Sequence, residues 1–337
     1  MFRRILAAAV LVLLVAALVV VGWPQLFGLE RQPVIAQIVS LRGLGVLVAA
    51  ALVILFTLFS LLAPARRRFA GSVALVLLVF SAVTVAVLAT RGFGDPAMQA
   101  KAPADVVVLS WNTLGDAPGA EAIAALALEV EADIVVLPET SAETAEIAAA
   151  IISATGRTMQ PLHLSLDEIS KARTTAVLIS TALGAYAVDT SAGSTPVLPS
   201  LIARPVDGTG PAIVAAHPVA PVAGEMESWR AGLDWLAEAC RGDDVILAGD
   251  LNSTLDHVTA LGADGGDLGR CHDAARTTGN GAVGTWPTSF PPLLGAPIDH
   301  VMATDGWQII GFRVVGSRDG DGSDHRPVVA QLRPAAG

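Results

Sequence analysis

The sequence contains little charge. Only 15% of its 337 residues are Asp, Glu, Lys or Arg, whereas 53% are hydrophobic, and the mean hydropathy is +0.60. This composition excludes a disordered chain, which would be rich in charge and poor in hydrophobic residues, and a collagen-like chain. A hydropathy this high is also unusual for a soluble globular protein. Part of the chain is therefore expected to lie in lipid.

Acidic residues are almost absent from the first hundred positions. Residues 1–100 hold eight of the 21 Lys and Arg residues but only Glu30 and Asp95 of the 31 acids, so their net charge is +6 and that of the remainder is −16. This contrast excludes a single uniform domain. The acidic remainder would repel phosphate backbones, which argues against a nonspecific nucleic-acid coat.

Three long runs in this first part carry no charge, at residues 5–22, 43–63 and 69–90. Each run can cross about 30 Å of hydrocarbon as a helix. Arginines precede the first run at positions 3 and 4 and fill the loop at 66–68, and such basic clusters remain in the cytoplasm. We therefore predict a multi-pass cell-membrane protein. Its N-terminus is cytoplasmic, residues 1–90 hold three transmembrane helices, and the rest of the chain is extracytoplasmic.

An alternative interpretation makes residues 1–22 a cleaved signal peptide. The apolar run is longer than a usual signal-peptide core, and no clear A-x-A cleavage site follows it. Under either interpretation the arginines at 66–68 leave the C-terminal part outside the cytoplasm. Residues 91–103 mix Gly, Pro and polar residues, which predicts a linker. Residues 104–337 are enough for one well-buried domain.

Cysteine is scarce, because Cys240 and Cys271 are the only two. Both belong to the predicted extracytoplasmic part, where an oxidising environment allows a disulfide. Two buried free thiols are the alternative, since spacing along the sequence does not show whether the Cα atoms approach within about 7 Å. The sequence also lacks GK[ST], H-E-x-x-H, C-x-x-C and G-x-S-x-G motifs. Their absence removes support for P-loop, zinc-protease, thioredoxin-like and serine-hydrolase functions.

Residues 104–337 alternate strand-like and helix-like segments. Continuous apolar runs predict buried strands at 106–111, 133–137, 175–180, 212–216, 244–248, 298–303, 307–315 and 327–332. Helical spacing or Ala-rich composition predicts helices at 120–131, 142–154 and 225–241. Interleaved strands and helices indicate a layered α/β or α+β domain.

Polar residues follow or open many of the predicted strands. They are Asn112, Glu139, His217, Asp250, Asn252, Asp299, Asp324 and His325. One such residue alone is commonly a turn or capping residue. Their joint occurrence predicts that they gather at one rim of a sheet, where layered α/β proteins bind their ligands. The remaining histidines are interpreted as structural or surface residues: His163, His257, His272 and His300.

The segments around these residues resemble the ordered motifs of the endonuclease/exonuclease/phosphatase superfamily. They are SWNTLG at 110–115, LPET at 137–140, AAHPVAP at 215–221, GDLN at 249–252, GTWP at 284–287, PIDHV at 297–301 and SDHRP at 323–327. The resemblance spans about residues 110–332. It implies a four-layer αββα sandwich, in which two mixed sheets lie face to face with helices outside, and metal-dependent cleavage of phosphate esters.

The resemblance and the side-chain chemistry together suggest a site for Mg²⁺ or Mn²⁺. Such an ion prefers oxygen ligands and needs only one or two protein carboxylates. Glu139 is the first expected ligand, Asp324 is the candidate second ligand, and Asn112 is expected to hold the shell in place. Many nucleases of the superfamily carry an acid at the position of Leu114. Asp116 is the candidate substitute for that acid.

The remaining residues are expected to act on the phosphate ester. Asp250 would orient or deprotonate the attacking water, and Asn252, on the same side of an extended segment, would donate its amide to the phosphate. His217 and His325 are expected to face the phosphoryl oxygens. Asp299 would hold the His325 ring in one tautomer through a carboxylate–imidazole hydrogen bond.

These expectations describe a membrane-anchored, divalent-metal-dependent phosphoesterase that acts outside the cytoplasm. Its partners are the lipid bilayer and a phosphate-ester substrate, which could be a lipid, a sugar phosphate or a nucleic acid, and no protein partner is inferred. A nuclease on the secreted side is one form of this enzyme. The rival hypothesis is a non-catalytic envelope receptor or scaffold that retains the fold. That hypothesis predicts gaps among the eight polar positions, and all eight are filled.

Overall fold

The computed structural model describes residues 1–94, 97–167 and 170–335. The chain divides into two compact units, Met1–Arg91 and Gly92–Gly337, which are named here the helical unit and the sandwich unit. Residues 95 and 96 of the predicted linker lie outside the described residues.

The helical unit contains three long apolar helices, α1 (Phe2–Gly22), α3 (Arg42–Leu62) and α4 (Arg67–Arg91), with the short α2 (Ile35–Ser40) between the first two. The three long helices have mean hydropathies of 3.2, 2.7 and 2.7 and are long and apolar enough to cross a membrane. They include most of the three predicted runs. The sequence therefore located three helices with the length and hydropathy of membrane spans.

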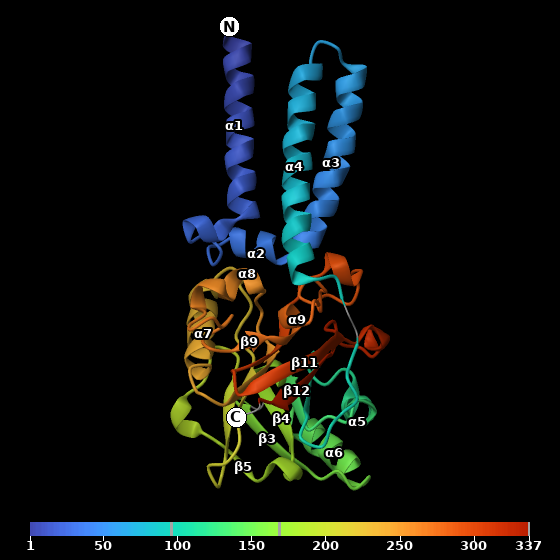
Figure 1. Ribbon diagram of the computed structural model, residues 1–337, viewed down its shortest axis with the longest axis vertical. Coiled ribbons are helices and arrows are strands. Elements are labelled where there is room, and N and C mark those ends of the chain that lie inside the picture. The colour runs from blue at the N-terminus through green and yellow to red at the C-terminus, as the bar shows by residue number, and fades with distance from the viewer. Residues whose placement is uncertain (95–96, 168–169, 336–337) are drawn as a thin grey trace. The chain divides into compact units, whose positions relative to one another are not determined.

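Helices α3 and α4 form a hairpin (Figure 1). The buried face of α4 is built mainly from small residues and consists of Ala70, Val73, Ala74, Leu77, Ser81 and Thr84. Small side chains allow close approach of helix backbones in an apolar environment. The two hydroxyl groups donate to carbonyl oxygens four residues earlier, from Ser81 to Leu77 and from Thr84 to Phe80, both at 2.9 Å. The polar atoms on this face are thus satisfied within the helix itself.

The sandwich unit is built on two six-stranded mixed sheets. The first has the strand order β11-β12-β1-β2-β4-β3, and the second has the order β5-β6-β7-β8-β10-β9. The strands of the first sheet are β1 (Val106–Ser110), β2 (Ile134–Pro138), β3 (Met159–Ser165), β4 (Thr174–Ser180), β11 (Trp307–Val314) and β12 (Val328–Pro334). Those of the second are β5 (Tyr186–Val188), β6 (Leu201–Pro205), β7 (Ala212–Ala216), β8 (Val245–Asp250), β9 (His272–Asp273) and β10 (Asp299–Ala303).

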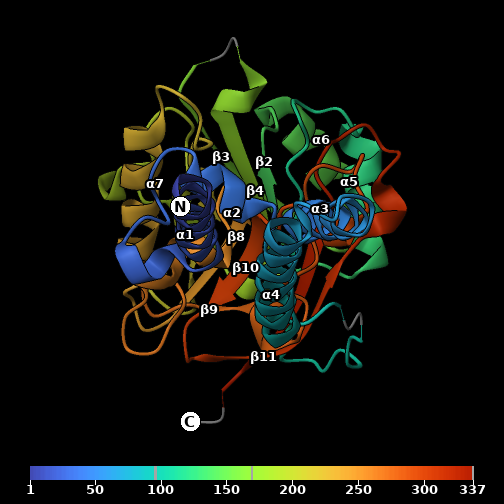
Figure 2. The same cartoon turned by 90° about the horizontal axis from the view of Figure 1, so that it is seen from above.

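Each sheet contains one parallel pair, β1 with β2 in the first and β7 with β8 in the second. Helices cover the outer faces: α5 (Gly119–Glu129) and α6 (Ala142–Ser153) lie on one side of the sheets, and α7 (Met226–Ala239) lies on the other (Figures 1 and 2). Two single-turn helices complete the unit, α8 (Leu255–Val258) and α9 (Ala274–Thr277). The predicted four-layer αββα sandwich is confirmed.

Strand β1 shows why the central strands are continuous apolar runs. Val106 and Val108 pack into the core between the two sheets. Val107 and Leu109 pack into a second core with residues of α5 and α6. Because side chains alternate across a strand, a strand buried on both faces needs apolar residues at every position. The strand is therefore buried between the core that separates the two sheets and the core beneath the helices.

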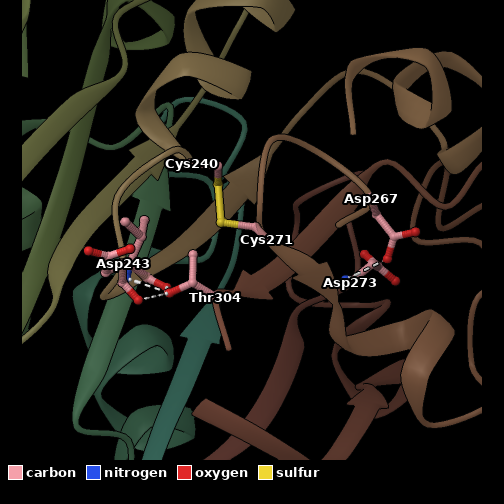
Figure 3. The surroundings of a disulfide bond; sticks show 7 residues. Cys240, Asp243, Asp267, Cys271, Asp273 and Thr304 are labelled. Atoms are coloured by element: carbon pink, nitrogen blue, oxygen red, sulfur yellow. Dashed lines mark hydrogen bonds between the residues drawn. A yellow bond between two sulfur atoms is a disulfide. The ribbon is translucent and has the colours of Figure 1, made fainter. Parts of the chain in front are cut away.

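Cys240 and Cys271 form a disulfide with a Cα–Cα distance of 5.6 Å (Figure 3). Cys240 follows α7, and Cys271 immediately precedes β9. Both residues are fully buried. Of the two alternatives left open by the sequence, the structure contains the bridge.

Candidate active site

Four of the predicted site residues follow the parallel strands. Asn112 and Glu139 come after β1 and β2 in the first sheet, His217 directly follows β7, and Asp250 ends β8 in the second. The carboxyl ends of parallel neighbours lie at the same edge of a sheet. Asn112 Nδ2 donates to both Glu139 Oε1 and Asp250 Oδ2, each at 3.0 Å, and so joins the two sheets.

His217 lies beside Glu139. Its Nε2 is 3.6 Å from Glu139 Oε1, its ring is fully buried, and its backbone N–H donates to Ser200 Oγ at 2.7 Å. Neither ring nitrogen has a hydrogen-bond partner in the described part of the chain. Burial alone would raise the pKa of Glu139, but the nearby His217 and the Asn112 amide hold that pKa below its ordinary value. Glu139 is therefore a carboxylate at neutral pH, and His217 keeps a free nitrogen beside it.

Asn252 holds Asp250 through two hydrogen bonds. Its backbone N–H donates to Asp250 Oδ1 at 2.8 Å, and its Nδ2 donates to Asp250 Oδ2 at 3.2 Å. The same amide nitrogen also donates to the Pro218 carbonyl at 3.0 Å. The expectation of an extended segment here is wrong, because Asn252 has a φ of 45° and lies in a bend. The two side chains meet because the backbone reverses, as short polar side chains in the left-handed region allow.

Burial governs the chemistry of Asp250. The desolvation of its carboxyl group, opposed by His325 and reinforced by Asp299, raises its pKa to about 6. The group is thus ionised at neutral pH, but it is a much stronger base than an exposed aspartate. A pKa close to the working pH suits proton transfer.

His325 and Asp299 form a carboxylate–imidazole pair, with Nδ1 and Oδ2 separated by 2.9 Å. The other ring nitrogen, Nε2, lies 3.8 Å from Asp250 Oδ2 and 3.9 Å from Asp324 Oδ1. Although burial opposes the charge on the ring, Asp299 and Asp250 raise the pKa of His325 to about 10. His325 is therefore an imidazolium whose Nε2–H faces the remaining carboxylates.

Asp324 lies at the rim of this cluster and is partly exposed. Its Oδ2 accepts a hydrogen bond of 2.8 Å from the indole nitrogen of Trp286. Its Oδ1 has no hydrogen-bond partner among residues 1–94, 97–167 and 170–335. All eight predicted residues thus belong to one connected group, and Trp286 extends that group.

The site offers several oxygen atoms to a divalent cation. Potential ligand atoms of Asp250, Asp299 and His325 lie within 4.8 Å of one another, and because His325 is protonated the carboxylate oxygens are the available ligands. Asp299 Oδ1 and Asp324 Oδ1 are buried atoms without a donor in the described chain. A buried carboxylate oxygen without a partner is costly, and a cation would remove that cost. The residues fit an ion with a preference for oxygen ligands.

This cluster differs from the ligand set expected from the sequence, which named Glu139, Asp324 and Asn112. Asp250 and Asp299 also present oxygen atoms to the same space. The side-chain oxygen of Asn112, Oδ1, accepts the Leu114 N–H at 3.0 Å, and the side-chain nitrogen faces the carboxylates. In this orientation the Asn112 nitrogen holds both carboxylates, and its side-chain oxygen is engaged by the Leu114 N–H.

Asp116 does not take the place of the acid that Leu114 lacks. Its carboxylate accepts hydrogen bonds from the backbone N–H and hydroxyl of Ser141, at 2.8 and 2.7 Å, and pairs with Lys171 at 3.0 Å. These contacts tie Asp116 to the start of α6. Leu114 itself is exposed.

Of the four histidines interpreted as structural or surface residues, two lie at the surface and two make structural contacts. His163 is exposed, and His272 pairs with Asp305 at 2.9 Å on the surface. His257 Nδ1 accepts the Thr254 N–H at 2.8 Å at the start of α8. His300 is buried and contacts Asp273 Oδ2 at 2.6 Å and the Ser253 carbonyl at 2.9 Å.

Arg326 is a further residue of the site to which the sequence assigned no role. Its buried guanidinium group donates to the carbonyls of Thr288 and Phe290, both at 2.9 Å, and to Asp319 Oδ2 at 2.7 Å. Its backbone N–H donates to the Thr285 carbonyl at 2.8 Å. Arg326 therefore attaches the 285–290 segment to the SDHRP motif that carries Asp324 and His325. An arginine just before an apolar strand was the only signal in the sequence.

We expect Arg326→Met to lower the free energy of unfolding by about 3 kcal/mol, because it leaves buried carbonyls and the Asp319 carboxylate without a donor. Thermal unfolding of the full-length protein, followed by tryptophan fluorescence, should show a Tm lower by roughly 6–12 °C. Arg318→Met is the matched control, since Arg318 forms surface ion pairs with Glu129 and Asp321. It should cost less than about 1 kcal/mol. Equal losses from the two variants would contradict the role given to Arg326.

Comparisons with known proteins agree with this fold. The model of the endonuclease/exonuclease/phosphatase family matches residues 109–325. An endonuclease/exonuclease/phosphatase from Beutenbergia cavernae is similar in structure, with a TM-score of 0.50 and 21% identity over 69% of this chain and 72% of that chain. A family protein from Bacteroides thetaiotaomicron has a TM-score of 0.51 and 16% identity over 69% of this chain and 98% of that chain.

At these identities the structural likeness shows the fold alone. No curated protein matches the chain. The family model, in contrast, covers more than half of the sequence and includes the segments that hold all eight site residues. The chain belongs to the endonuclease/exonuclease/phosphatase family.

Proposed function

We propose that this protein is a membrane-anchored hydrolase that cuts phosphate esters with Mg²⁺ or Mn²⁺ and acts outside the cytoplasm. The observation that carries the proposal is the Asn112 amide, which binds Glu139 of one sheet and Asp250 of the other at 3.0 Å. Two histidines, His217 and His325, lie beside the same carboxylates. Members of the family are hydrolases of phosphate esters, which supports the same reaction here.

Asp250 is the proposed base for the attacking water. Its pKa of about 6 leaves it ionised at neutral pH and able to accept a proton, while Asn252 fixes both of its oxygens. A divalent ion, when bound, would withdraw negative charge from the phosphate group. The site's remaining tasks are to hold the ester and to stabilise the anion that develops during attack.

The imidazole groups are proposed to stabilise the phosphoryl oxygens. His325 is protonated and keeps its Nε2–H available, because Nδ1 is engaged by Asp299. His217 has two buried ring nitrogens without partners in the described chain, and one of them could donate to a phosphoryl oxygen. Donors held in a buried site stabilise developing charge without reorganisation. These side chains would thus act mainly on the transition state.

We expect the full-length protein in detergent micelles to release p-nitrophenol from bis-p-nitrophenyl phosphate or from p-nitrophenyl phosphate. Chelation with EDTA should reduce the rate at least about 100-fold, and Mg²⁺ or Mn²⁺ should restore it, because the ion would offset the charge of the phosphate. His163→Gln is the control, since His163 is exposed, and it should behave as wild type. No hydrolysis of either ester with any divalent ion would favour the non-catalytic receptor instead.

The extracytoplasmic location is a separate part of the proposal. It is supported by Arg3 and Arg4 in the first turn of α1 and by the arginines at 66–68, which lie just before α4 and in its first turn. Alkaline phosphatase fused after the last residue should be active, because that enzyme needs an oxidising compartment. The same reporter fused within the 64–66 loop should be inactive. The reverse pattern would overturn the proposed orientation.

A further inference from the structure

An uncharged loop reaches the active site. Residues 277–298 contain no Asp, Glu, Lys or Arg and form the longest such run after Arg91. Within this run Trp286, Phe290 and Leu293 are exposed by 36, 37 and 46%. The segment 286–294 is named here the apolar lip. Its Trp286 indole donates to Asp324 at 2.8 Å, and Asp324 Oδ1 lies 3.9 Å from His325 Nε2, so the lip borders the catalytic cluster.

The apolar lip is held in place by the catalytic motif itself. Arg326 donates to the carbonyls of Thr288 and Phe290, and the Thr288 N–H donates to the Asp324 carbonyl at 2.9 Å. Prolines at 287, 291 and 292 further restrict its backbone. The exposed side chains of the lip are thus presented by an ordered segment. An ordered apolar surface beside a catalytic site is typical of a surface that binds a ligand.

Two other loops of the site also expose aliphatic side chains. Leu114 comes two residues after Asn112, and Val222 comes five residues after His217, with exposures of 46 and 52%. Leu114 occupies the position where an acid was expected, and Asp116 is directed toward Ser141 and Lys171. Aliphatic or aromatic side chains are therefore exposed in three loops of the site.

The charge of the sandwich unit narrows the choice of substrate. The sequence after residue 100 has a net charge of −16, which repels polyanions such as nucleic acids. An ester with a single phosphate and an apolar part would be repelled less than a polyanion. Its apolar part would cover the exposed side chains of the apolar lip. Tryptophan is a side chain that favours the boundary between water and lipid.

The chain enters the sandwich unit beside the loop that leads to the lip. The Gly94 N–H donates to the Gly279 carbonyl at 3.1 Å, and the Ala282 N–H donates to the Gly92 carbonyl at 3.0 Å. A Cβ at Gly92 would lie 2.0 Å from the Gly279 oxygen, so this close approach requires glycine. Gly92 directly follows Arg91, the last residue of α4. The first residues of the sandwich unit therefore pack on residues 279–282, which lead to Trp286.

We propose that the substrate is an amphiphilic phosphate ester of the lipid class, whose apolar part lies on the apolar lip. This inference rests on the proposed hydrolase function and names its substrate class. The phosphate lies among the carboxylates and imidazoles, and the adjoining hydrocarbon contacts Trp286, Phe290 and Leu293. Cleavage adds water across one P–O bond: the water oxygen joins phosphorus, and the leaving oxygen takes a proton.

The test uses the full-length protein in detergent micelles and two pairs of probes that differ only in chain length. The diesters are ethyl and dodecyl p-nitrophenyl phosphate, and the monoesters are ethyl and dodecyl phosphate. For the active pair, kcat/KM should be at least about 20-fold higher for the dodecyl probe, since burial of only a few methylenes gives such a factor.

Partition of the dodecyl probe into micelles also raises its rate of hydrolysis. Variants must therefore separate this partition from the contact of the dodecyl chain with the apolar lip. The variant Phe290→Ser/Leu293→Ser should lower the dodecyl-to-ethyl ratio at least about 5-fold, because it removes apolar contact area. Val206→Ser, an exposed valine in the turn between β6 and β7, should leave the ratio unchanged. Partition is the same for all three proteins.

The outcomes distinguish this inference from the proposed function. Equal kcat/KM for the dodecyl and ethyl probes would overturn the lipid substrate, as would a wild-type ratio in the double variant, which would point to a protein partner on the lip. If the double variant fails to fold, Phe290→Ser and Leu293→Ser alone answer the same question. Hydrolysis of none of the four probes would overturn the hydrolase function itself.

Discussion

Replacing Asp250 with Asn is expected to reduce kcat for phosphate ester hydrolysis by about 1,000-fold, a typical contribution of a positioned base. The change removes the group that accepts the proton from water and leaves the side chain nearly the same size. Because Asp250 is buried and its pKa is raised to about 6, the wild-type rate should fall as the pH drops below that value. Steady-state rates between pH 4.5 and 9 in Asp250→Asn should lack this acidic limb.

The matched control for this experiment is Asp207→Asn. Asp207 is an exposed carboxylate in the turn between β6 and β7, and its hydrogen bonds are to Thr209. The control should keep the wild-type rate and its acidic limb. A loss of less than about 10-fold in Asp250→Asn would exclude Asp250 as the base, because positioned bases contribute more than that. An unchanged Tm in Asp250→Asn would show that the fall in kcat does not come from destabilisation of the fold.

Reduction of the disulfide between Cys240 and Cys271 is expected to lower the free energy of unfolding by about 3–4 kcal/mol. The bridge closes a loop with a sequence separation of 31 residues, and this restricts the unfolded chain. The loop contains β8, which ends at Asp250, and Asn252, which follows it. Tryptophan fluorescence during heating, with and without dithiothreitol, should show a fall in Tm of roughly 10 °C.

The reduced wild type keeps both buried sulfur atoms, so it isolates the effect of the bond from the effect of packing. Cys240→Ala/Cys271→Ala is the second variant, and it should be at least as unstable as the reduced protein because it also loses two buried sulfurs. Its Tm should not respond to dithiothreitol. A difference below about 1 kcal/mol between oxidised and reduced wild type would contradict a stabilising bridge.

The sequence predicted the parts of the fold that are buried on both faces or are long and apolar enough to cross a membrane. The central strands and the three long helices are continuous apolar runs. The length of such a run distinguishes a buried strand from a helix that can span a membrane. Strand β3 was missed, because it includes Pro161 and the exposed His163 and lies at the edge of its sheet. Strands β5 and β6 were also missed; β5 has only three residues. Edge strands lack the strong pattern of central ones.

The motifs identified the chemical groups of the site but not all of its geometry. Residues such as Glu139 and His325 were found because acids and imidazoles at strand ends are rare enough to be informative together. The contacts of Arg326 with Thr288 and of Trp286 with Asp324 join positions 38 residues apart. No local pattern encodes such a pairing. The backbone conformation at Asn252 was also missed. Here the cause is local, since asparagine tolerates both extended and left-handed backbone.

The hydrogen bonds of Asn112 make one amide group sensitive to the separation of the two sheets. Its nitrogen holds Glu139 of one sheet and Asp250 of the other at the same 3.0 Å. A shift of one sheet by a single ångström would break one of these bonds, since hydrogen bonds fail beyond about 3.5 Å. A non-hydrolysable phosphonate that contacts residues of both sheets should therefore stabilise their present separation. Its binding should raise the Tm of the protein, and tighter binding should raise it more.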